Sequence, residues 1–355
     1  MSNLYTLGFN QDLANYIETN NLNTFTVGRV AQQHRDGYIV LTGRESKKAT
    51  ITGNLRYTVS EKSELPVVGD WVLLIDSGDL YLIYQVLPRH TRLERQALQG
   101  LSESQLIASN IDEALIVQSV DQNFNLNRLE RYISICHTGN IQPIIVLNKI
   151  DLIDNNRLNT LINEVRQRIP NVTLITTTTL FEHGAHQLLE KLQPQKTYCL
   201  VGSSGVGKSS LINALTKQDV MKTSSLSQAH QKGKHTTTHR ELFVLDNGAL
   251  IIDTPGMREL GVTESGHGLS QTFEQIDLLA ADCQFVDCSH TSEPNCAVLE
   301  AIRRGELDEG ALKNFKKLQR ESQRFETSKA EKRKIDKGFS KMYKEVMKMR
   351  NKRRF

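Results

Sequence analysis

The sequence predicts an α/β protein in which a mainly parallel sheet follows a small β-barrel and precedes a metal-binding, mainly helical region. Short β-rich runs fill residues 26–93. From Ile111 onward, strands alternate with amphipathic stretches, which is typical of a parallel sheet. Three cysteines and a histidine lie between Cys283 and Cys296. The 355 residues suffice for two or three domains that each bury a core.

The positive charge of the chain is concentrated at its C-terminal end. Residues 313–355 carry 17 Lys and Arg against 5 Asp and Glu, a net +12, which leaves −8 for the first 312 residues because the whole chain is +4. Such an asymmetry usually marks a tail that meets a polyanion, and a solvated charged helix is the alternative. We expect a basic helix over residues 313–325, with Leu312, Phe315 and Leu318 on one face, and a flexible basic tail over residues 328–355.

The sequence shows no membrane or secretion signal. It contains no run of about 18 apolar residues, and its start, Met1-Ser2-Asn3-Leu4, lacks the basic-then-apolar order of a signal peptide. Five cysteines, an odd number, argue against a disulfide framework. We therefore expect a soluble, cytoplasmic monomer without a membrane partner.

The N-terminal part predicts a polar, helical extension over residues 1–24 and a barrel over residues 25–98. Alternating or β-branched runs, separated by Gly and Asp turns, are Gly37–Leu41, Trp71–Ile75 and Leu80–Tyr84. Five or so strands in about 70 residues fit an OB-fold, which commonly binds oligonucleotides on one face. An SH3-like barrel that only spaces domains is the alternative.

Residues 99–275 predict the parallel α/β sheet. Its candidate strands are Ala114–Val120, Ile141–Leu147, Val172–Ile175, Tyr198–Val201, Leu242–Leu245 and Ala249–Ile252. Apolar residues at helical spacing between the first strands, such as Leu126, Leu129 and Ile133, predict core-facing helices. Cys136 and Cys199 lie in such apolar segments and are expected in the core.

A complete phosphate-loop pattern follows the strand Tyr198–Val201 and precedes an apolar helical stretch. Glycines let backbone N–H groups face the phosphates, Lys208 reaches their oxygens, and the Ser209 hydroxyl ligates Mg²⁺. The predicted nucleotide-binding residues of this loop are Gly202, Ser203, Ser204, Gly205, Val206, Gly207, Lys208, Ser209 and Ser210. The flanking strand and helix are the context that this motif requires.

The choice of base comes from Asn148-Lys149-Ile150-Asp151, which follows an apolar strand. The Asp151 carboxylate can accept two hydrogen bonds from the guanine edge, whereas adenine would leave polar groups unpaired. Thr176 and Thr177, after the next strand, stand where a short loop would contact the base. Together with the phosphate loop, these residues predict binding of GTP over ATP.

Two further segments predict the switches of a GTPase. In Asp253-Thr254-Pro255-Gly256, Asp253 would hold Mg²⁺ through a water and Gly256 would sense the γ-phosphate. Upstream, Gly233–Thr238 would supply Thr237 as a second Mg²⁺ ligand, although a disordered polar loop is the alternative.

Catalysis must differ from that of GTPases with a water-orienting glutamine, because Met257 follows Gly256 and forms no strong hydrogen bond to water. His235 is the candidate for positioning the water, with a plain surface residue as the alternative. We expect Lys208, Thr237 and His235 to act in catalysis, and slow hydrolysis that a large partner accelerates.

The order of these motifs is unusual, because the base-reading element precedes the phosphate loop. The same sheet forms if the termini of an ordinary GTPase are joined and the chain is opened elsewhere, so we predict a circularly permuted GTPase domain. The chain that leaves Gly256 then runs directly into the C-terminal region, which favours coupling between the two.

The cysteine cluster reads C-x4-C-x-H-x5-C. Three thiolates and an imidazole, Cys283, Cys288, His290 and Cys296, make a closed tetrahedral zinc site with no open position for catalysis. Buried free thiols beside a fortuitous histidine are the alternative. We expect this zinc-binding domain to span residues 276–327.

The motif order and several short segments resemble the RsgA (YjeQ) family of ribosome-associated GTPases. The segments are Val68–Val72, Leu87–Arg89, Asn148–Asp151, His235–Thr238 and the Cys/His cluster. The resemblance covers nearly the whole chain and implies an OB-fold, a permuted GTPase domain, a zinc domain, and late maturation of the small ribosomal subunit. Asn295 stands where the family usually has Gly, and Thr176-Thr177 replaces a Ser-rich loop. Asn tolerates the left-handed conformation.

The expected partners are GTP or GDP and the small ribosomal subunit with its rRNA, which the barrel and the basic tail would contact in a salt-dependent way. One alternative is an RNA-binding scaffold in which GTP only locks the shape. Another is a translation factor that acts on whole ribosomes.

Overall fold

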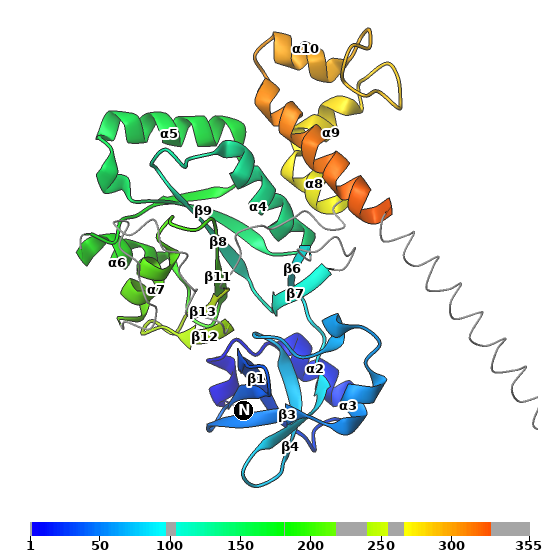
Figure 1. Ribbon diagram of the computed structural model, residues 1–355, viewed down its shortest axis with the longest axis vertical. Coiled ribbons are helices and arrows are strands. Elements are labelled where there is room, and N and C mark those ends of the chain that lie inside the picture. Colours follow the sequence, from blue (N-terminus) through cyan, green and yellow to red (C-terminus); the bar gives the residue numbers. More distant parts are fainter. Residues whose placement is uncertain (1, 97–103, 181, 218–239, 255–265, 328–355) are drawn as a thin grey trace, which may run out of the picture.

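The computed structural model describes residues 2–96, 104–180, 182–217, 240–254 and 266–327. Figure 1 shows a barrel, a sheet with helices on both faces, and a helical region at the far end. The expected residues His235, Thr237, Gly256 and Met257, and the tail 328–355, lie outside the described part. None of the described helices is long and apolar enough to cross a membrane.

The N-terminal extension is helical, as expected, and it is part of the core. Its helices are α1 (Ser2–Tyr5) and α2 (Gln11–Thr19). The Asn10 side chain accepts from the Leu13 N–H at the start of α2, so the helix begins with a capped turn. Leu4, Leu7, Phe9, Leu13 and Ile17 are buried in the main hydrophobic cluster.

A closed barrel of five strands follows, which confirms the expected OB-type barrel. Its elements are β1 (Thr26–Gln33), β2 (Tyr38–Thr42), β3 (Ser46–Ile51), α3 (Gly53–Thr58), η1 (Lys62–Glu64), β4 (Trp71–Asp76) and β5 (Tyr81–Val86). The strands pair in the order β1, β2, β3, β5, β4, and β4 closes the ring on β1. Closure leaves the barrel without a free strand edge inside the ring.

A two-stranded hairpin, β6 (Arg92–Gln96) and β7 (Ser104–Ser109), leads from the barrel to the larger sheet. The sequence pattern did not predict these two strands. The junction is held by Arg29, which is 1% exposed. Its guanidinium donates to the carbonyls of Leu7, Gly69 and Asn110, and so ties the extension, the barrel and the sheet together. Buried polar groups of this kind must be satisfied, so the junction has one favoured geometry.

The larger sheet contains the six strands that the sequence predicted, with ends that differ by one or two residues. Its elements are β8 (Glu113–Ser119), α4 (Leu126–Thr138), β9 (Gln142–Asn148), η2 (Ile150–Leu152), α5 (Asn155–Arg168), β10 (Thr173–Thr176), α6 (Glu182–Lys191), β11 (Thr197–Val201), α7 (Lys208–Thr216), β12 (Arg240–Val244) and β13 (Leu250–Asp253). The spatial order is β10, β9, β8, β11, β13, β12. All pairs are parallel except β12 with β13.

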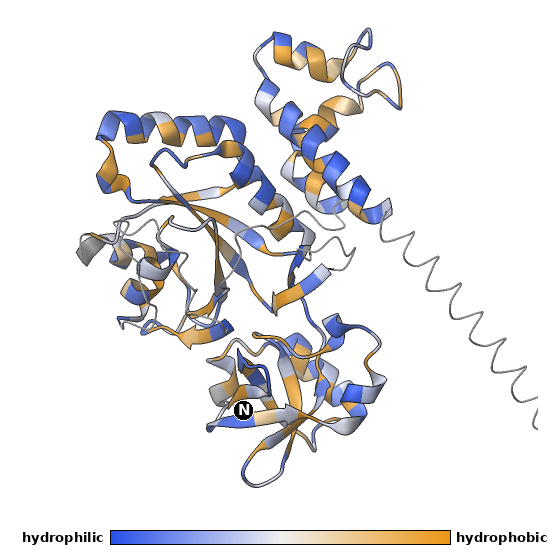
Figure 2. Ribbon diagram, in the orientation of Figure 1, coloured by the Kyte–Doolittle hydropathy of each residue, from blue (hydrophilic) through white to orange (hydrophobic). Residues whose placement is uncertain are grey.

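Helices cover both faces of this sheet because successive strand residues point to opposite sides. Ile116 of β8 packs in the cluster that contains Leu129 of α4 and Leu161 of α5. Leu115 and Val117 pack in the cluster of α6 and α7. Figure 2 shows the central strands as largely hydrophobic and α4 and α5 as mixed. The barrel continues the sheet, since β1 pairs with β12 at Gln32 and Gln33.

The C-terminal region has a small core of its own. It consists of α8 (Gly266–Thr272), α9 (Glu274–Ala280), α10 (Ala297–Arg303) and a helix over residues 309–327, which we call the C-terminal helix. The expected face of Leu312, Phe315 and Leu318 is buried against Phe273, Ile276 and Val298. The rings of Phe273 and Phe315 meet edge to face, 5.4 Å between centroids. Figure 1 shows this helix lying alongside α4.

Candidate functional site

The predicted phosphate loop connects β11 to α7. Gly202 and Gly207 have φ angles of +151° and +98°, which L side chains rarely adopt. Val206 is buried and anchors the loop in the α6–α7 cluster. The Lys208 ammonium donates to the carbonyls of Gly202 and Ser203 at 2.7 Å each, so it lies along the loop. Ser209 and Ser210 are half-buried in the first turn of α7, whereas Ser204 and Gly205 are exposed.

The predicted base-reading motif is bonded directly to this loop. Asn148, at the end of β9, is fully buried and donates from Nδ2 to the Val206 carbonyl at 2.8 Å. Lys149 takes the left-handed conformation, φ 62°, and its ammonium donates to the Gly205 carbonyl at 2.6 Å. Residues that are more than fifty positions apart in the chain therefore form one site.

Gly207 makes this approach possible. A Cβ atom built on Gly207 would lie 2.3 Å from Asn148 Nδ2, far inside van der Waals contact. The glycine is therefore required twice, by its positive φ and by the close passage of the base-reading motif.

Asp151 has a partner that the sequence analysis missed. The Thr178 hydroxyl donates to Asp151 Oδ1 in a short hydrogen bond, and it also accepts from the Leu180 N–H at 3.2 Å. The expected residues Thr176 and Thr177 serve the backbone instead: Thr176 pairs in β10, and Thr177 donates to the Gly184 carbonyl at 2.9 Å. Thr178 is the third of four consecutive threonines, residues 176–179, and the sequence does not distinguish it from its neighbours.

Asp253 ends β13 beside the phosphate loop. Its side chain is 6% exposed. Burial raises the pKa of Asp253 to about 6, and the positive charge of Lys208 opposes this shift. The next residue, Thr254, donates its hydroxyl to the Leu200 carbonyl of β11 at 3.1 Å, which fixes the end of β13 against the strand that precedes the loop. Asp253 is thus a carboxylate near the phosphate loop that titrates unusually high.

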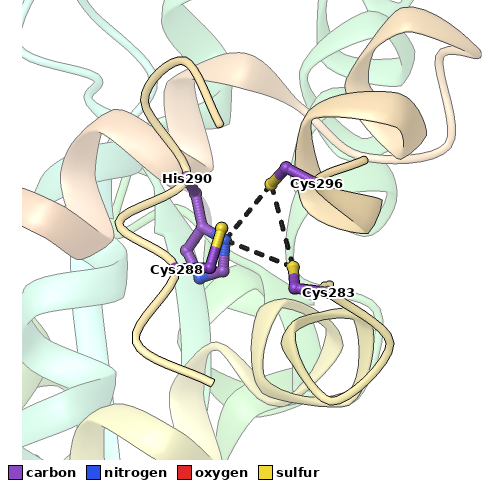
Figure 3. A group of neighbouring side chains, drawn as sticks. All are labelled: Cys283, Cys288, His290 and Cys296. Atoms are coloured by element: carbon purple, nitrogen blue, oxygen red, sulfur yellow. Dashed lines mark hydrogen bonds between the residues drawn. The ribbon is translucent and has the colours of Figure 1, made fainter. Parts of the chain in front are cut away.

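The four predicted metal ligands converge on one point, as Figure 3 shows. The ligand atoms of Cys283, Cys288, His290 and Cys296 all lie within 4.8 Å of one another. His290 Nδ1 is 3.4 Å from Cys296 Sγ and 3.6 Å from Cys283 Sγ, and the two thiols are 3.8 Å apart. Such spacing suits tetrahedral coordination of zinc with sulfur and nitrogen ligands.

The loop around this cluster is pre-formed by backbone chemistry. His290 and Asn295 both have left-handed φ angles, 54° and 53°. Burial, with the nearby Lys316 charge, lowers the pKa of His290, which favours the neutral imidazole that binds metal. Glu293 accepts from the backbone N–H groups of Thr291 and Ser289 and closes the turn. The donor set therefore fits a structural zinc ion.

The sheet, the phosphate loop and the base-reading motif define a P-loop GTPase. In a GTPase whose chain starts with the phosphate loop, the equivalents of β11, β12 and β13 come first and those of β8, β9 and β10 come last. Here β8, β9 and β10 come first in the chain, so the domain is circularly permuted. The model of the RsgA GTPase family matches residues 86–263, and a model described as a 50S ribosome-binding GTPase matches residues 197–330. The chain belongs to the RsgA family of GTPases.

Named relatives agree along most of the chain. A "Small ribosomal subunit biogenesis GTPase RsgA 1" from Oceanobacillus iheyensis is 40% identical over 298 residues, 83% of this chain and 84% of the relative. One from Bacteroides thetaiotaomicron is 37% identical over 350 residues, 98% of this chain and 97% of the relative. The crystal structure of YjeQ from Thermotoga maritima matches with a TM-score of 0.61 and 25% identity, over 82% of this chain and 96% of that one.

Proposed function

We propose that this GTPase acts in late assembly of the small ribosomal subunit and that the subunit stimulates its hydrolysis of GTP. The observation that carries the nucleotide assignment is the direct bonding of Asn148 and Lys149 to the phosphate loop. It brings the guanine-reading carboxylate of Asp151 to the loop that would cradle the phosphates. The relatives named above carry the assignment to the small subunit.

Within this proposal, the phosphate loop holds the nucleotide through its backbone N–H groups and Lys208. Ser209, Asp253 and Thr237 would hold Mg²⁺, which would supply positive charge to neutralise the phosphates. Gly256 senses the γ-phosphate, and His235 positions the attacking water because Met257 forms no strong hydrogen bond to it. Thr178 supports Asp151, and Thr176 and Thr177 shape the loop beside the base. Burial raises the pKa of Asp253 to about 6 in the metal-free protein, and a bound Mg²⁺ would lower it again because the cation favours the carboxylate.

The flanking regions supply the contacts to the subunit. In the sequence, the barrel precedes the nucleotide-binding sheet and the basic segment 313–355, net +12, follows it. Both would contact rRNA through its phosphates. Zinc would hold the loop between α9 and α10 so that the C-terminal helix is presented in one orientation. The proposed division of the chain is the extension 1–24, the OB-fold 25–98, the GTPase domain 99–275, the zinc domain 276–327 and the tail 328–355. Because Leu269 of α8 and Ile276 of α9 pack in the core of the C-terminal region, we propose that the zinc domain begins before α8.

Turnover assays test the proposal directly. GTP and ATP hydrolysis are measured for the full chain alone, with purified small subunits, with large subunits and with whole ribosomes. We expect slow GTP turnover alone, strong stimulation by small subunits and no ATP turnover. Stimulation by whole ribosomes only would indicate a translation factor, and equal turnover with and without any particle would overturn the proposal.

A base-exchange variant tests the role of Asp151 separately. Asp151→Asn replaces a carboxylate that accepts two hydrogen bonds by an amide that also donates. Guanine offers donors at this edge, whereas xanthine offers a carbonyl oxygen, so we expect GTP affinity to fall by about a hundredfold and xanthosine triphosphate to be accepted.

The variant Ser209→Ala distinguishes a GTPase whose release is timed by hydrolysis from an RNA-binding scaffold. A factor timed by hydrolysis would fail to dock or would stay trapped on the subunit, whereas a scaffold would release normally.

A further inference from the structure

Helix α4 lies between the phosphate loop and the C-terminal helix. Two neighbouring residues of α4, Arg131 and Tyr132, point to different sides because successive helix residues are about 100° apart. Tyr132 is 3% exposed, and its hydroxyl lies 3.5 Å from Ser203 Oγ in the phosphate loop. Arg131 faces the C-terminal helix, and its guanidinium forms a bidentate ion pair with the Glu321 carboxylate, with N···O distances of 2.6 and 2.7 Å.

Ser203, which Tyr132 contacts, is also bonded to Lys208, the lysine that is predicted to bind the phosphates. Ser203 accepts from the Lys208 ammonium through its carbonyl, at 2.7 Å. The Tyr132 contact, at 3.5 Å, is longer than a well-formed O–H···O hydrogen bond, so an approach of α4 toward the loop would strengthen it. Ser203 therefore connects α4 to the reactive end of the loop.

The contact with the C-terminal helix is more than one ion pair. Asn314 donates to Glu130 Oε2 at 2.6 Å and to the Asn127 carbonyl at 3.1 Å. Glu130 is 2% exposed and is also held by Arg168 of α5, through bonds of 2.8 Å. A buried carboxylate with these partners has one favoured arrangement, so the C-terminal helix docks on α4 in one position.

We propose that Tyr132 is a positioning residue for the phosphate loop and that, with Arg131 and Glu321, it links nucleotide binding to the docking of the C-terminal helix. The inference rests on the proposed binding of GTP at this site. Linkage is reciprocal: if docking of the C-terminal helix changes nucleotide affinity by some factor, the nucleotide changes docking by the same factor. A particle that binds the basic helix would act on the phosphate loop through α4, a route that does not pass through residues 255–265.

A double-mutant cycle on the full chain tests the link. The affinity for fluorescent GDP is measured for the parent, Tyr132→Phe, Glu321→Ala and the double variant. We expect each single change to weaken binding by about three- to fivefold and the double change to weaken it no more than the larger single effect, since both break one pathway. Glu309→Ala is the matched control, because Glu309 pairs with Lys313 on an exposed face of the same helix. It should leave the affinity unchanged.

The outcomes separate this inference from the proposed function. The link would be overturned if the two changes lowered the GDP affinity by factors that multiply, or if Glu321→Ala left the affinity unchanged. In either case the parent would still bind GDP. Failure of the parent to bind GDP at all would overturn the proposed function itself. A second readout is hydrogen exchange of residues 309–327, which GDP should slow in the parent and leave unaltered in Tyr132→Phe. Equal melting temperatures and zinc contents establish that the variants are folded.

Discussion

The Thr178 hydroxyl donates a hydrogen bond to the carboxylate of Asp151. The two residues follow β10 and β9, which are neighbouring parallel strands, so the carboxyl ends of both strands meet at one edge of the sheet. This hydrogen bond holds the Asp151 carboxylate, which would accept hydrogen bonds from guanine, in one orientation.

Removing this hydroxyl should weaken guanine binding. Thr178→Val keeps the shape and loses the bond to Asp151, so we expect the affinity for fluorescent GDP to fall by about five- to tenfold, or about 1 kcal/mol. Thr178→Ser retains a hydroxyl and should stay within about twofold of the parent. Equal affinities of the Val and Ser variants would show that the bond plays no part.

Adding a methyl group at Gly207 should damage the nucleotide site. The new Cβ would lie 2.3 Å from Asn148 Nδ2 at a residue whose φ is +98°, so Gly207→Ala must displace the base-reading motif or the loop. We expect loss of nucleotide binding and a stability decrease of about 2 kcal/mol or more. Gly78→Ala, in the turn between β4 and β5, is the control, since its φ is +78° but no atom lies within 4 Å of the added Cβ. It should cost about 1 kcal/mol through backbone strain alone, and binding losses of the same size in both variants would contradict the prediction.

His137 should make the fold sensitive to acid. Its side chain is 8% exposed and its Nδ1 lies 3.0 Å from the Thr272 hydroxyl of α8. Burial, with a smaller effect of His267, lowers the pKa of His137 from 6.5 to about 4. Between these values the unfolded chain binds a proton that the folded chain does not, so stability falls as the pH decreases from 6.5 toward 4.

The size of this effect is about 1 kcal/mol at pH 5.5, and His137→Gln should remove it. Thermal melting of parent and variant from pH 7.5 to 5.5 gives the comparison, and loss of metal at low pH affects both chains alike. Parallel melting curves over the whole range would show that His137 does not titrate as its burial requires.

Zinc removal should destabilise the C-terminal region while the core of the nucleotide-binding sheet stays folded. The ligand atoms lie among α9, α10 and the loop between them, which belong to a separate small core. Cys288→Ser should bind less than the one equivalent of zinc of the parent and expose α9 and α10 to proteolysis. Cys136→Ala, a buried thiol of α4 outside the cluster, should keep its zinc. Full zinc content in Cys288→Ser would contradict the assignment.

The sequence alone was sufficient where chemistry is local. The phosphate loop, the guanine motif and the four metal ligands each occupy fewer than fifteen consecutive residues, and their spacing is dictated by backbone geometry and ligand number. The five parallel strands of the sheet were likewise readable, because buried parallel strands are continuous apolar runs. The pair of strands β6 and β7 was missed because their sequences, RLERQ and SQLIAS, contain no continuous apolar run of that length.

What the sequence determined, then, is which residues are the candidates for the chemistry, because each motif needs only its neighbours in the chain. The tertiary structure decided which of them meet: Asn148 with Val206, Thr178 with Asp151, and Arg131 with Glu321, which is 190 residues away. Contacts at such separations depend on how helices and strands pack across a whole sheet, and no local pattern of residues encodes that packing.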